Sequence, residues 1–280
     1  MHPPPARIYT LGPEGTFSDQ AAQRLATGLG LAGVPITYTR TIPEVMAHTE
    51  AEPDALGVVP IENSVAGTVT QTQDNLLRHH QTILWEINIR VRFSLVADGP
   101  LERVEVLLAH PQAYDQCAEY LAGHLPQAQV RFTNSNVASG LSFLEERGTG
   151  PMAAIVPVEF GAQHRELVAG EDIQDFANNT TRFLVTRRRD EAAPDLARDK
   201  TSLLIEPQAD RPGLLYELLS IFNRHGINLS RLESRPSKVT PWVYVFFIDF
   251  NNNAASAACL EELRTTANRI TVLGSYDLLE

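Results

Sequence analysis

Cysteine is scarce in this sequence. Only Cys117 and Cys259 occur in 280 residues, so we expect no disulfide framework, and no cysteine–histidine cluster has the spacing of a zinc site. No apolar run reaches the roughly 18 residues that a membrane helix needs, and the opening Met-His-Pro-Pro-Pro lacks a signal-peptide pattern. These absences predict a cytoplasmic protein with no metal site and no membrane contact.

Positive charge is also in deficit. Lysine and arginine together number 23 against 34 aspartate and glutamate residues, which gives a net charge of −11. A diffuse negative field disfavours nucleic acids and anionic membranes as partners, because both need a basic face. A small anionic ligand is still compatible with this charge, since one pocket can be locally positive.

The length, with 43% hydrophobic residues, is typical of about two globular domains. The charged stretch 187–199 has no apolar periodicity and is typical of a linker between domains. After it, the pattern predicts strand, helix, strand, strand, helix and strand, which is the ferredoxin-like order. The predicted elements span 201–206, 211–222, 227–234, 242–250, 254–268 and 270–273.

Before the linker, short apolar strands alternate with helical patterns, which predicts an α/β fold with parallel sheet. The strands are expected at 8–11, 57–61, 104–109 and 153–156. Ligands in such folds bind at the carboxyl ends of strands, where helix N-termini offer unpaired amides to anions. The residues that directly follow these strands are therefore the candidates for a binding site.

Four polar blocks stand beside predicted strands. They are Gly12-Pro-Glu-Gly-Thr-Phe-Ser18, Pro60-Ile-Glu-Asn-Ser-Val-Ala-Gly67, His110-Pro-Gln-Ala-Tyr-Asp-Gln-Cys117 and Asn178-Asn-Thr-Thr-Arg-Phe183. Each block also has a purely structural interpretation, as a capped helix start or a polar loop. In a regular strand Thr181 and Phe183 share one face while Arg182 takes the other.

Well-known catalytic and nucleotide-binding motifs are missing. The sequence has no Walker loop, no Gly-x-Gly-x-x-Gly, no Gly-x-Ser-x-Gly and no His-Glu-x-x-His. Residue patterns alone therefore predict a polar, anion-binding cleft and leave the reaction open.

The four blocks, in this order, resemble those of the prephenate dehydratases. The matching residues are Gly12–Ser18, Pro60–Ser64 with Gly67, His110–Gln112 with Gln116-Cys117, and Thr181–Phe183. The C-terminal part resembles the ACT regulatory domain of the same enzymes, through Pro212-Gly213 and Glu233-Ser-Arg-Pro236. The resemblance extends over about residues 7 to 275.

The resemblance implies a cofactor-free enzyme that converts prephenate to phenylpyruvate, with loss of water and carbon dioxide, and that is inhibited by phenylalanine. It implies a two-lobed catalytic domain, similar to type II periplasmic binding proteins, in a homodimer or homotetramer. We expect a catalytic domain at 1–187, with one lobe at about 1–80 plus 176–187 and the other at 85–170. A linker at 188–199 and a regulatory domain at 200–280 follow.

The resemblance also assigns roles to residues. Thr181 would protonate or hydrogen-bond the departing hydroxyl, and Asn63 and Gln112 would hold the substrate. The other expected substrate contacts are Thr16, Ser18, Glu62, Ser64, Ser135, Arg182 and Phe183. The expected phenylalanine contacts are Gly213, Leu214, Leu215, Asn228, Glu233, Ser234, Arg235 and Pro236. Gly213-Leu214-Leu215 stands where the family usually has Gly-Ala-Leu, and the extra bulk would narrow the effector pocket or alter its preference.

Two other functions are compatible with the sequence. One is arogenate dehydratase, which acts on the amino analogue of prephenate and yields phenylalanine directly. The other is a non-catalytic protein that senses amino acids. The intact Thr181-Arg182-Phe183 block favours an enzyme, since a sensor has no need of that threonine.

Overall fold

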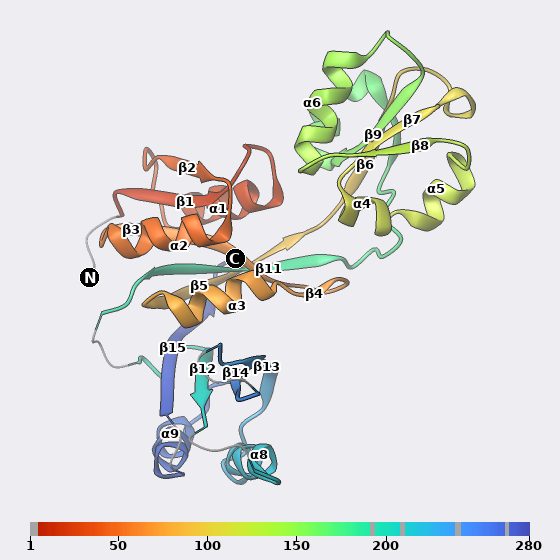
Figure 1. Cartoon of the computed structure of the whole chain (residues 1–280). Coiled ribbons are helices and arrows are strands. Elements are labelled where there is room, and N and C mark those ends of the chain that lie inside the picture. Colours follow the sequence, from red (N-terminus) through yellow and green to blue (C-terminus); the bar gives the residue numbers. More distant parts are fainter. Residues whose placement is uncertain (1–4, 191–193, 208–210, 239–241, 267–268) are drawn as a thin grey trace.

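The computed structural model describes residues 5–190, 194–207, 211–238, 242–266 and 269–280. They form two α/β lobes and a C-terminal domain that lies below the first lobe in the view of Figure 1. In these ranges no helix is both long and apolar enough to cross a membrane.

Lobe 1 contains both chain segments that flank lobe 2. Its strands are β1 (Arg7–Leu11), β2 (Ile36–Thr39), β3 (Ala55–Asn63), β4 (Gly67–Thr68), β5 (Gln81–Arg90) and β11 (Thr180–Arg188). Its helices are α1 (Phe17–Gly28), α2 (Ile42–Ala51) and α3 (Thr70–Arg78). Strand β1 runs parallel to β2 and β3, as expected, whereas β11 returns from lobe 2 and lies antiparallel between β3 and β5.

Lobe 2 is a separate five-stranded sheet in the order β10-β6-β9-β7-β8. The strands are β6 (Phe93–Ala97), β7 (Val106–Ala109), β8 (Gln129–Phe132), β9 (Met152–Pro157) and β10 (Val168–Glu171). The helices are α4 (Pro111–Asp115), α5 (Ala118–His124), α6 (Asn136–Glu146) and α7 (Val158–Gln163), with short 3-10 turns η1 (Leu101–Arg103) and η2 (Arg165–Leu167). The turn η1 explains why the strand expected from 104 begins at Val106.

The expected start of the second lobe at residue 85 is wrong. Strand β5 continues to Arg90 and pairs with β11 along its length, from Gln81↔Arg188 to Arg90↔Thr180. Residues 85–90 therefore belong to the sheet of lobe 1, and lobe 2 begins with β6 at Phe93. The boundary was misplaced because β5 contains no glycine or proline that would mark where the chain passes from lobe 1 to lobe 2.

The C-terminal domain has the predicted order of elements. These are β12 (Lys200–Glu206), α8 (Leu214–Arg224), β13 (Leu229–Pro236), β14 (Tyr244–Asn251), α9 (Ser256–Thr265) and β15 (Arg269–Leu278). The strand order β13-β14-β12-β15 confirms the ferredoxin-like arrangement. The last two residues of the helix predicted at 254–268 lie outside the described ranges.

Strand β15 is much longer than the predicted 270–273, because its pairing with β12 continues to Tyr276 and its last two residues have a further partner. Asp277 and Leu278 pair in parallel with Trp85 and Glu86 of β5, so the two domains share one ten-stranded sheet. Gly274 makes this approach possible, since a Cβ atom there would lie 2.2 Å from the Ile83 carbonyl oxygen. Only a residue without a side chain fits at this crossing.

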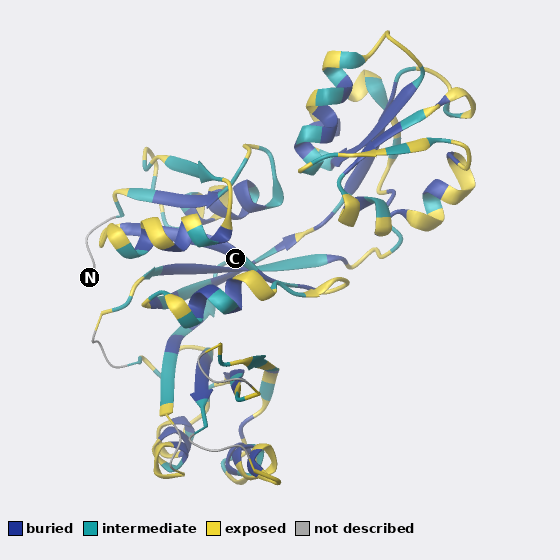
Figure 2. Ribbon diagram, in the orientation of Figure 1, coloured by how far each residue is buried: buried dark blue, intermediate teal, exposed yellow. Residues whose placement is uncertain are grey.

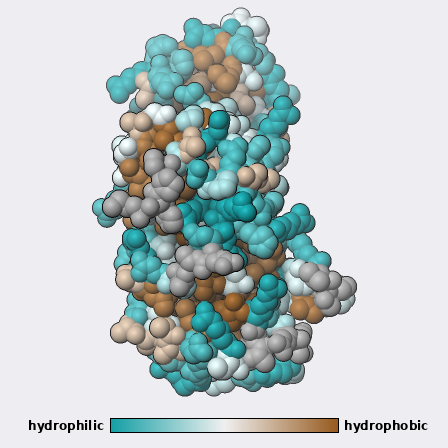
Figure 3. All heavy atoms as spheres, turned by 90° about the vertical axis from the view of Figure 1, so that its left-hand side faces the viewer, coloured by the Kyte–Doolittle hydropathy of each residue, from teal (hydrophilic) through white to brown (hydrophobic). Residues whose placement is uncertain are grey.

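The sheets form the interior of all three parts. Figure 2 shows the strands largely buried, with the outer faces of the helices exposed. On the face of the molecule in Figure 3, hydrophobic residues gather in separate areas between hydrophilic ones. In α8, for example, the residues Leu214, Leu218, Ile221 and Phe222 are buried on one side of the helix.

Candidate active site

Two of the polar blocks meet where β3 ends and β11 begins. Asn63 lies opposite Thr181, and Glu62 lies opposite Arg182, in adjacent antiparallel pairs. Because side chains alternate along a strand, the first pair and the second pair face opposite sides of the sheet. The two residues expected at the centre of the chemistry, Asn63 and Thr181, are thus neighbours in the structure.

Asn63 is almost fully buried, and every polar atom of its side chain is used. Its carbonyl oxygen accepts hydrogen bonds from the backbone N–H groups of Val65 and Ala66, at 3.0 and 2.8 Å. Its amide nitrogen donates to the Thr181 hydroxyl at 2.9 Å and to the Asn179 side-chain oxygen at 2.7 Å. Since two backbone donors identify the oxygen, the nitrogen must face Thr181.

The Thr181 hydroxyl therefore accepts a hydrogen bond and keeps its own hydrogen for another acceptor. Among the described residues no acceptor is paired with that hydrogen. A hydroxyl that accepts from an amide and donates outward is arranged to hydrogen-bond an oxygen of a bound molecule.

Asn179 and Gln116 complete the contact set, and sequence reasoning missed both as site residues. Asn179 is fully buried, and its amide nitrogen donates to the Gln116 side-chain oxygen at 2.9 Å. Gln116 follows α4 in lobe 2, so a row of amides links lobe 2 to Asn63 and Thr181. The Gln116 side-chain nitrogen is buried without a protein partner. Both residues lie inside the polar blocks of the sequence, but only the fold brings Asn63 and Gln116 into contact with Asn179.

Several expected substrate contacts hold the local backbone instead. Thr16 is the N-cap of α1, where its hydroxyl accepts from the Asp19 N–H and donates to the Pro13 carbonyl at 2.9 Å. Ser135 caps α6 through the Ala138 N–H at 3.0 Å. Ser64 accepts from the Thr180 N–H at 3.0 Å and so fixes the start of β11. These contacts shape the loops around Asn63 and Thr181.

Lobe 2 contributes the His110–Gln112 block. His110 is the N-cap of α4 and accepts from the Gln112 N–H, and burial lowers the pKa of His110 below its ordinary value. Gln112 itself is exposed in the first turn of α4. Its side chain is therefore free to meet a ligand at the carboxyl end of β7.

The first block of lobe 1 touches lobe 2. A Cβ atom on Gly15 would lie 3.5 Å from a Val137 methyl group of α6, and Gln20 donates to Glu159 of α7 at 2.9 Å. Phe17 also meets Phe93 edge to face, with ring centroids 5.7 Å apart. The segment 12–18, whose last two residues, Phe17 and the buried Ser18, begin α1, therefore closes one side of the space between the lobes.

The prediction that Arg182 binds the substrate is wrong. Its guanidinium lies on the face opposite Thr181 and contacts the carboxylates of Asp249, Glu86 and Glu62 at 2.5, 2.8 and 3.4 Å. Burial by itself lowers the pKa of Arg182, but Asp249, Tyr276 and Glu86 outweigh it and raise the pKa above the ordinary value.

Glu62 and Phe183 are corrected for related reasons. Glu62 shares the Arg182 face, where it meets Arg182 and the side chain of Arg231 rather than Thr181. Phe183 shares the Thr181 face but is only 1% exposed, within the core beneath α1. Neither side chain is placed to contact a ligand beside Thr181.

The expected effector residues divide between two sides of β13. Glu233 accepts from the Thr68 hydroxyl at 3.1 Å, and Arg235 donates to Asp74 at 2.9 Å, so both face lobe 1. Ser234 and Pro236 alternate with them and are exposed. The motif is thus split between lobe 1 and the surface.

The helix-start part of the effector motif is only partly at the surface. Gly213 has φ +83° at the start of α8, with open space where a Cβ would be. Leu214 is buried in the domain core, whereas Leu215 is partly exposed and Asn228 is exposed. Of the two leucines, only Leu215 offers surface to an effector.

Other features of the described residues do not add a second reactive site. Cys117 and Cys259 are buried, and burial raises the pKa of each thiol, to about 11 for Cys259. No group of three or more His, Cys, Asp or Glu side chains there could hold a metal ion.

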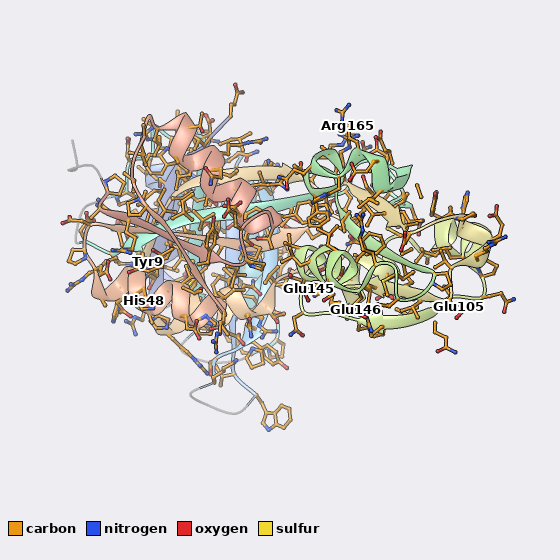
Figure 4. All side chains as sticks on the ribbon, turned by 90° about the horizontal axis from the view of Figure 1, so that it is seen from above. Tyr9, His48, Glu105, Glu145, Glu146 and Arg165 are labelled. Carbon is orange, nitrogen blue, oxygen red and sulfur yellow. The ribbon has the colours of Figure 1, made fainter. Side chains whose placement is uncertain are left out.

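A hollow of about 850 Å³ lies at the amino ends of β7 and β8, beside Glu105 and Gln129. Figure 4 shows Glu105 at the far end of lobe 2 from Tyr9 and His48 of lobe 1. Since ligands in α/β folds bind at the carboxyl ends of strands, this hollow is not the site of Asn63 and Thr181.

Comparison with known proteins matches both parts of the chain. The family model for prephenate dehydratase matches residues 8–191, and that for the ACT domain matches residues 202–268. The prephenate dehydratase of Methanocaldococcus jannaschii is 33% identical over 280 residues, covering 98% of this chain and 99% of that protein. The bifunctional chorismate mutase/prephenate dehydratase of Aquifex aeolicus is 37% identical, covering 96% and 73%.

Solved structures show the same similarity. A prephenate dehydratase from Arthrobacter aurescens in complex with L-Phe has a TM-score of 0.84 at 31% identity, covering 97% of this chain and 90% of that one. The prephenate dehydratase from Staphylococcus aureus has a TM-score of 0.80 at 26% identity, covering 96% and 99%. The two-lobed arrangement and the ferredoxin-like domain thus occur together in these relatives.

Proposed function

Since the chain belongs to the prephenate dehydratase family, we propose that it is a cytoplasmic lyase that converts prephenate to phenylpyruvate at the Asn63–Thr181 pair. The observation that carries this proposal is the hydrogen bond of 2.9 Å from the Asn63 amide to the Thr181 hydroxyl. It leaves the hydroxyl hydrogen available to the substrate.

The chemistry needs one proton and a fixed geometry. The bond between the ring carbon and its hydroxyl oxygen breaks, and the hydroxyl takes a proton and leaves as water. The bond between the ring and its carboxylate breaks as well, and its electron pair enters the ring, which becomes aromatic as carbon dioxide departs. The decarboxylation thus supplies the electrons that the departing hydroxyl removes.

Thr181 would donate its hydroxyl hydrogen to the departing oxygen, while Asn63 holds the Thr181 oxygen. A threonine hydroxyl is a weak acid, so orientation and dipoles supply much of the effect. Gln112, exposed on α4, and the loop 12–18 would position the anionic substrate from the other sides of the cleft. The Gln116 side-chain oxygen, which accepts from Asn179, would hold the amide row from lobe 2.

We also propose that phenylalanine inhibits the enzyme through the C-terminal domain. The relative from Arthrobacter aurescens was solved with L-Phe, and this chain has the same domain order. The exposed side of β13, with Ser234 and Pro236, and Leu215 on α8 would contribute to the effector site. Strand β13 is the edge of the ten-stranded sheet, which supports a homodimer or homotetramer built on this domain.

The test is phenylpyruvate formation from prephenate by the purified protein, with and without phenylalanine, and with arogenate as a parallel substrate. Turnover of prephenate that phenylalanine suppresses would support the proposal. Turnover of arogenate alone would assign the amino substrate instead. A folded protein that turns over neither substrate would overturn the enzymatic proposal and favour the sensor. Light scattering during gel filtration tests the oligomeric state.

A further inference from the structure

A partly buried group of charges lies where the C-terminal domain meets lobe 1, with Glu62 its most exposed member. This junction cluster contains three carboxylates and three cations from both domains: Glu62, Glu86, Asp249, Arg182, Lys200 and Arg231. Figure 1 shows β12–β15 meeting lobe 1 beside β5 and β11. The cluster balances its formal charges, which is the condition under which buried ions are tolerated.

Arg182 is at the centre of the cluster. Its Nη2 atom donates to Asp249 of β14 at 2.5 Å and to the Tyr276 hydroxyl of β15 at 3.3 Å. Its Nε atom lies 2.8 Å from Glu86, although that N–H does not point at the carboxylate oxygen. Glu86 also accepts from Lys200 of β12 at 2.7 Å. One residue of β11 thus contacts two strands of the C-terminal domain directly, and a third through Glu86.

Glu62 connects the cluster to β13. Its carboxylate lies 3.4 Å from Arg182 and 3.9 Å from Arg231, so it is shared between a cation of each domain. The Arg231 side chain is 6% exposed, and its Nε and one Nη atom are buried without hydrogen-bond partners. A small movement of β13 would exchange these long contacts for a short one, because unsatisfied buried donors favour a closer acceptor.

The same strand carries half of the effector motif. Arg231, Glu233 and Arg235 face lobe 1, and Leu232, Ser234 and Pro236 alternate with them toward solvent. A ligand on the solvent side of β13 would therefore contact Ser234 or Pro236, and the residues next to these in the strand, Glu233 and Arg235, contact lobe 1. Arg231 lies 3.9 Å from the Glu62 carboxylate, and Glu62 directly precedes Asn63 in the chain, so Glu62 joins β13 to the catalytic pair.

We propose that Glu62 and Arg182 are positioning residues that set the geometry of Asn63 and Thr181 according to the state of β13. This inference rests on the proposed function. Glu62 and Arg182 form one antiparallel pair, and Asn63 and Thr181 form the next. Glu62 and Asn63 share a peptide bond, as do Thr181 and Arg182. A shift of the Glu62–Arg182 pair therefore reorients the side chains of Asn63 and Thr181.

The test compares Glu62→Gln and Arg231→Gln with the wild type. A matched control is Glu262→Gln, which neutralises a carboxylate paired with Arg224 and His225 on the surface of the C-terminal domain. We expect Glu62→Gln to lower kcat about tenfold with KM changed less than threefold, because orientation rather than binding is lost. Arg231→Gln should keep kcat while the phenylalanine concentration for half inhibition rises at least tenfold. The control should match the wild type in both.

Phenylalanine binding is measured separately, by calorimetry, and should persist in all three variants. Hydrogen exchange of the segments 61–66 and 178–183 should respond to phenylalanine in the wild type and the control, and not in Arg231→Gln. Wild-type kcat and inhibition in both cluster variants would overturn the inference. A higher KM at unchanged kcat in Glu62→Gln would also overturn it, since Glu62 would then be a substrate ligand.

The two proposals fail in different ways. A wild type inactive on prephenate and arogenate overturns the proposed function, whereas the exchange experiment still decides whether β13 communicates with the catalytic pair. A wild type that does not bind phenylalanine overturns the regulatory part of the inference. Where Glu62→Gln does not fold, Arg231→Gln decides, because it removes a side chain that makes no short hydrogen bond.

Discussion

The Asn63 amide nitrogen lies 2.9 Å from the Thr181 hydroxyl oxygen, and two backbone N–H groups on the Asn63 oxygen fix which atom faces the threonine. The direction of this hydrogen bond makes Thr181 a donor to whatever occupies the cleft. It can be tested by changing each partner without changing its shape.

Replacing Thr181 by valine removes the hydroxyl and keeps the volume. We expect kcat to fall at least about a hundredfold, since general-acid assistance typically supplies 10²- to 10⁴-fold. Thr181→Ser should recover most of the rate, because it restores the donor. Steady-state kinetics on prephenate measures both. Equal rates for the valine variant and the wild type would exclude a role for the hydroxyl.

Replacing Asn63 by aspartate removes the donor of two hydrogen bonds, to Thr181 and to Asn179. The aspartate can still accept from Val65 and Ala66, but its other oxygen would accept the Thr181 hydrogen instead of donating to its oxygen. The hydroxyl would then no longer face the substrate, and we expect a loss of about 10²-fold in kcat. The same aspartate oxygen would also face the Asn179 side-chain oxygen, so we expect a loss in the free energy of unfolding as well, which urea denaturation measures separately from kcat. An active Asn63→Asp variant would contradict the assigned direction.

Asn179→Ala removes the middle of the amide row. The buried Gln116 oxygen would lose its donor and the Asn63 nitrogen one of its acceptors, so we expect a loss of about 1–3 kcal/mol in the free energy of unfolding. We also expect a lower kcat, because Asn63 would no longer be held from two sides. Urea denaturation and kinetics test the two effects, and stability equal to the wild type would argue against the row.

Asp74→Asn tests the contact between α3 and β13 and has a pH signature. Burial raises the pKa of Asp74, but hydrogen bonds from Lys238 and Arg235 outweigh it and hold the pKa below the ordinary 3.8. Because the pKa of Asp74 is lower in the folded than in the unfolded protein, its ion pairs stabilise the fold above pH 3.8. This stabilisation is lost as the pH falls through the pKa of Asp74 in the folded protein.

We therefore expect Asp74→Asn to lower the free energy of unfolding by about 1–2 kcal/mol at neutral pH. The difference from the wild type should shrink as the pH falls below 3.8. Glu261→Gln, which alters an exposed pair with Arg264, is the control and should have almost no effect. A difference that stays constant with pH would show that the ion pairs are not its cause.

Gly274→Ala tests the crossing of β15 and β5. The added methyl group would meet the Ile83 carbonyl oxygen at 2.2 Å, so one strand must move. We expect a loss of more than about 2 kcal/mol in stability and separate unfolding of the C-terminal domain. Gly123→Ala, in α5 with open space around it, should be neutral or stabilising. Cooperative unfolding of Gly274→Ala at the wild-type temperature would contradict the steric argument.

Local pattern predicted much of the fold and the approximate position of the site. Strands at 8–11, 57–61 and 153–156 and all six elements of the C-terminal domain are present, because apolar periodicity reports burial directly. The alternation of Thr181 and Arg182 was also predicted from strand geometry and is confirmed. The assignment of Arg182 to the substrate failed because the sequence does not reveal that Glu86 and Asp249 lie against the other face of β11.

The remaining features depend on distant contacts. Asn179 meets Gln116 and Asn63 across 63 and 116 positions, and no local pattern encodes such a meeting. The pairing of β15 with β5 likewise joins ends of two domains that sequence analysis treats separately. Strand β5 was not among the predicted strands, and its partners β11 and β15 are likewise distant in the sequence.

The two adjacent pairs, Asn63 with Thr181 and Glu62 with Arg182, restrict how this sequence can change in length. A one-residue deletion just before Thr181 would move Arg182 to the cleft face and Phe183 among the ion pairs, and one just before Asn63 would move Asn63 to the face of Glu62. Homologues with working sites should therefore differ in length in the connecting loops rather than in these strand ends. Substitutions can change the side chains on either face of the sheet, but the number of residues between the two pairs must stay the same.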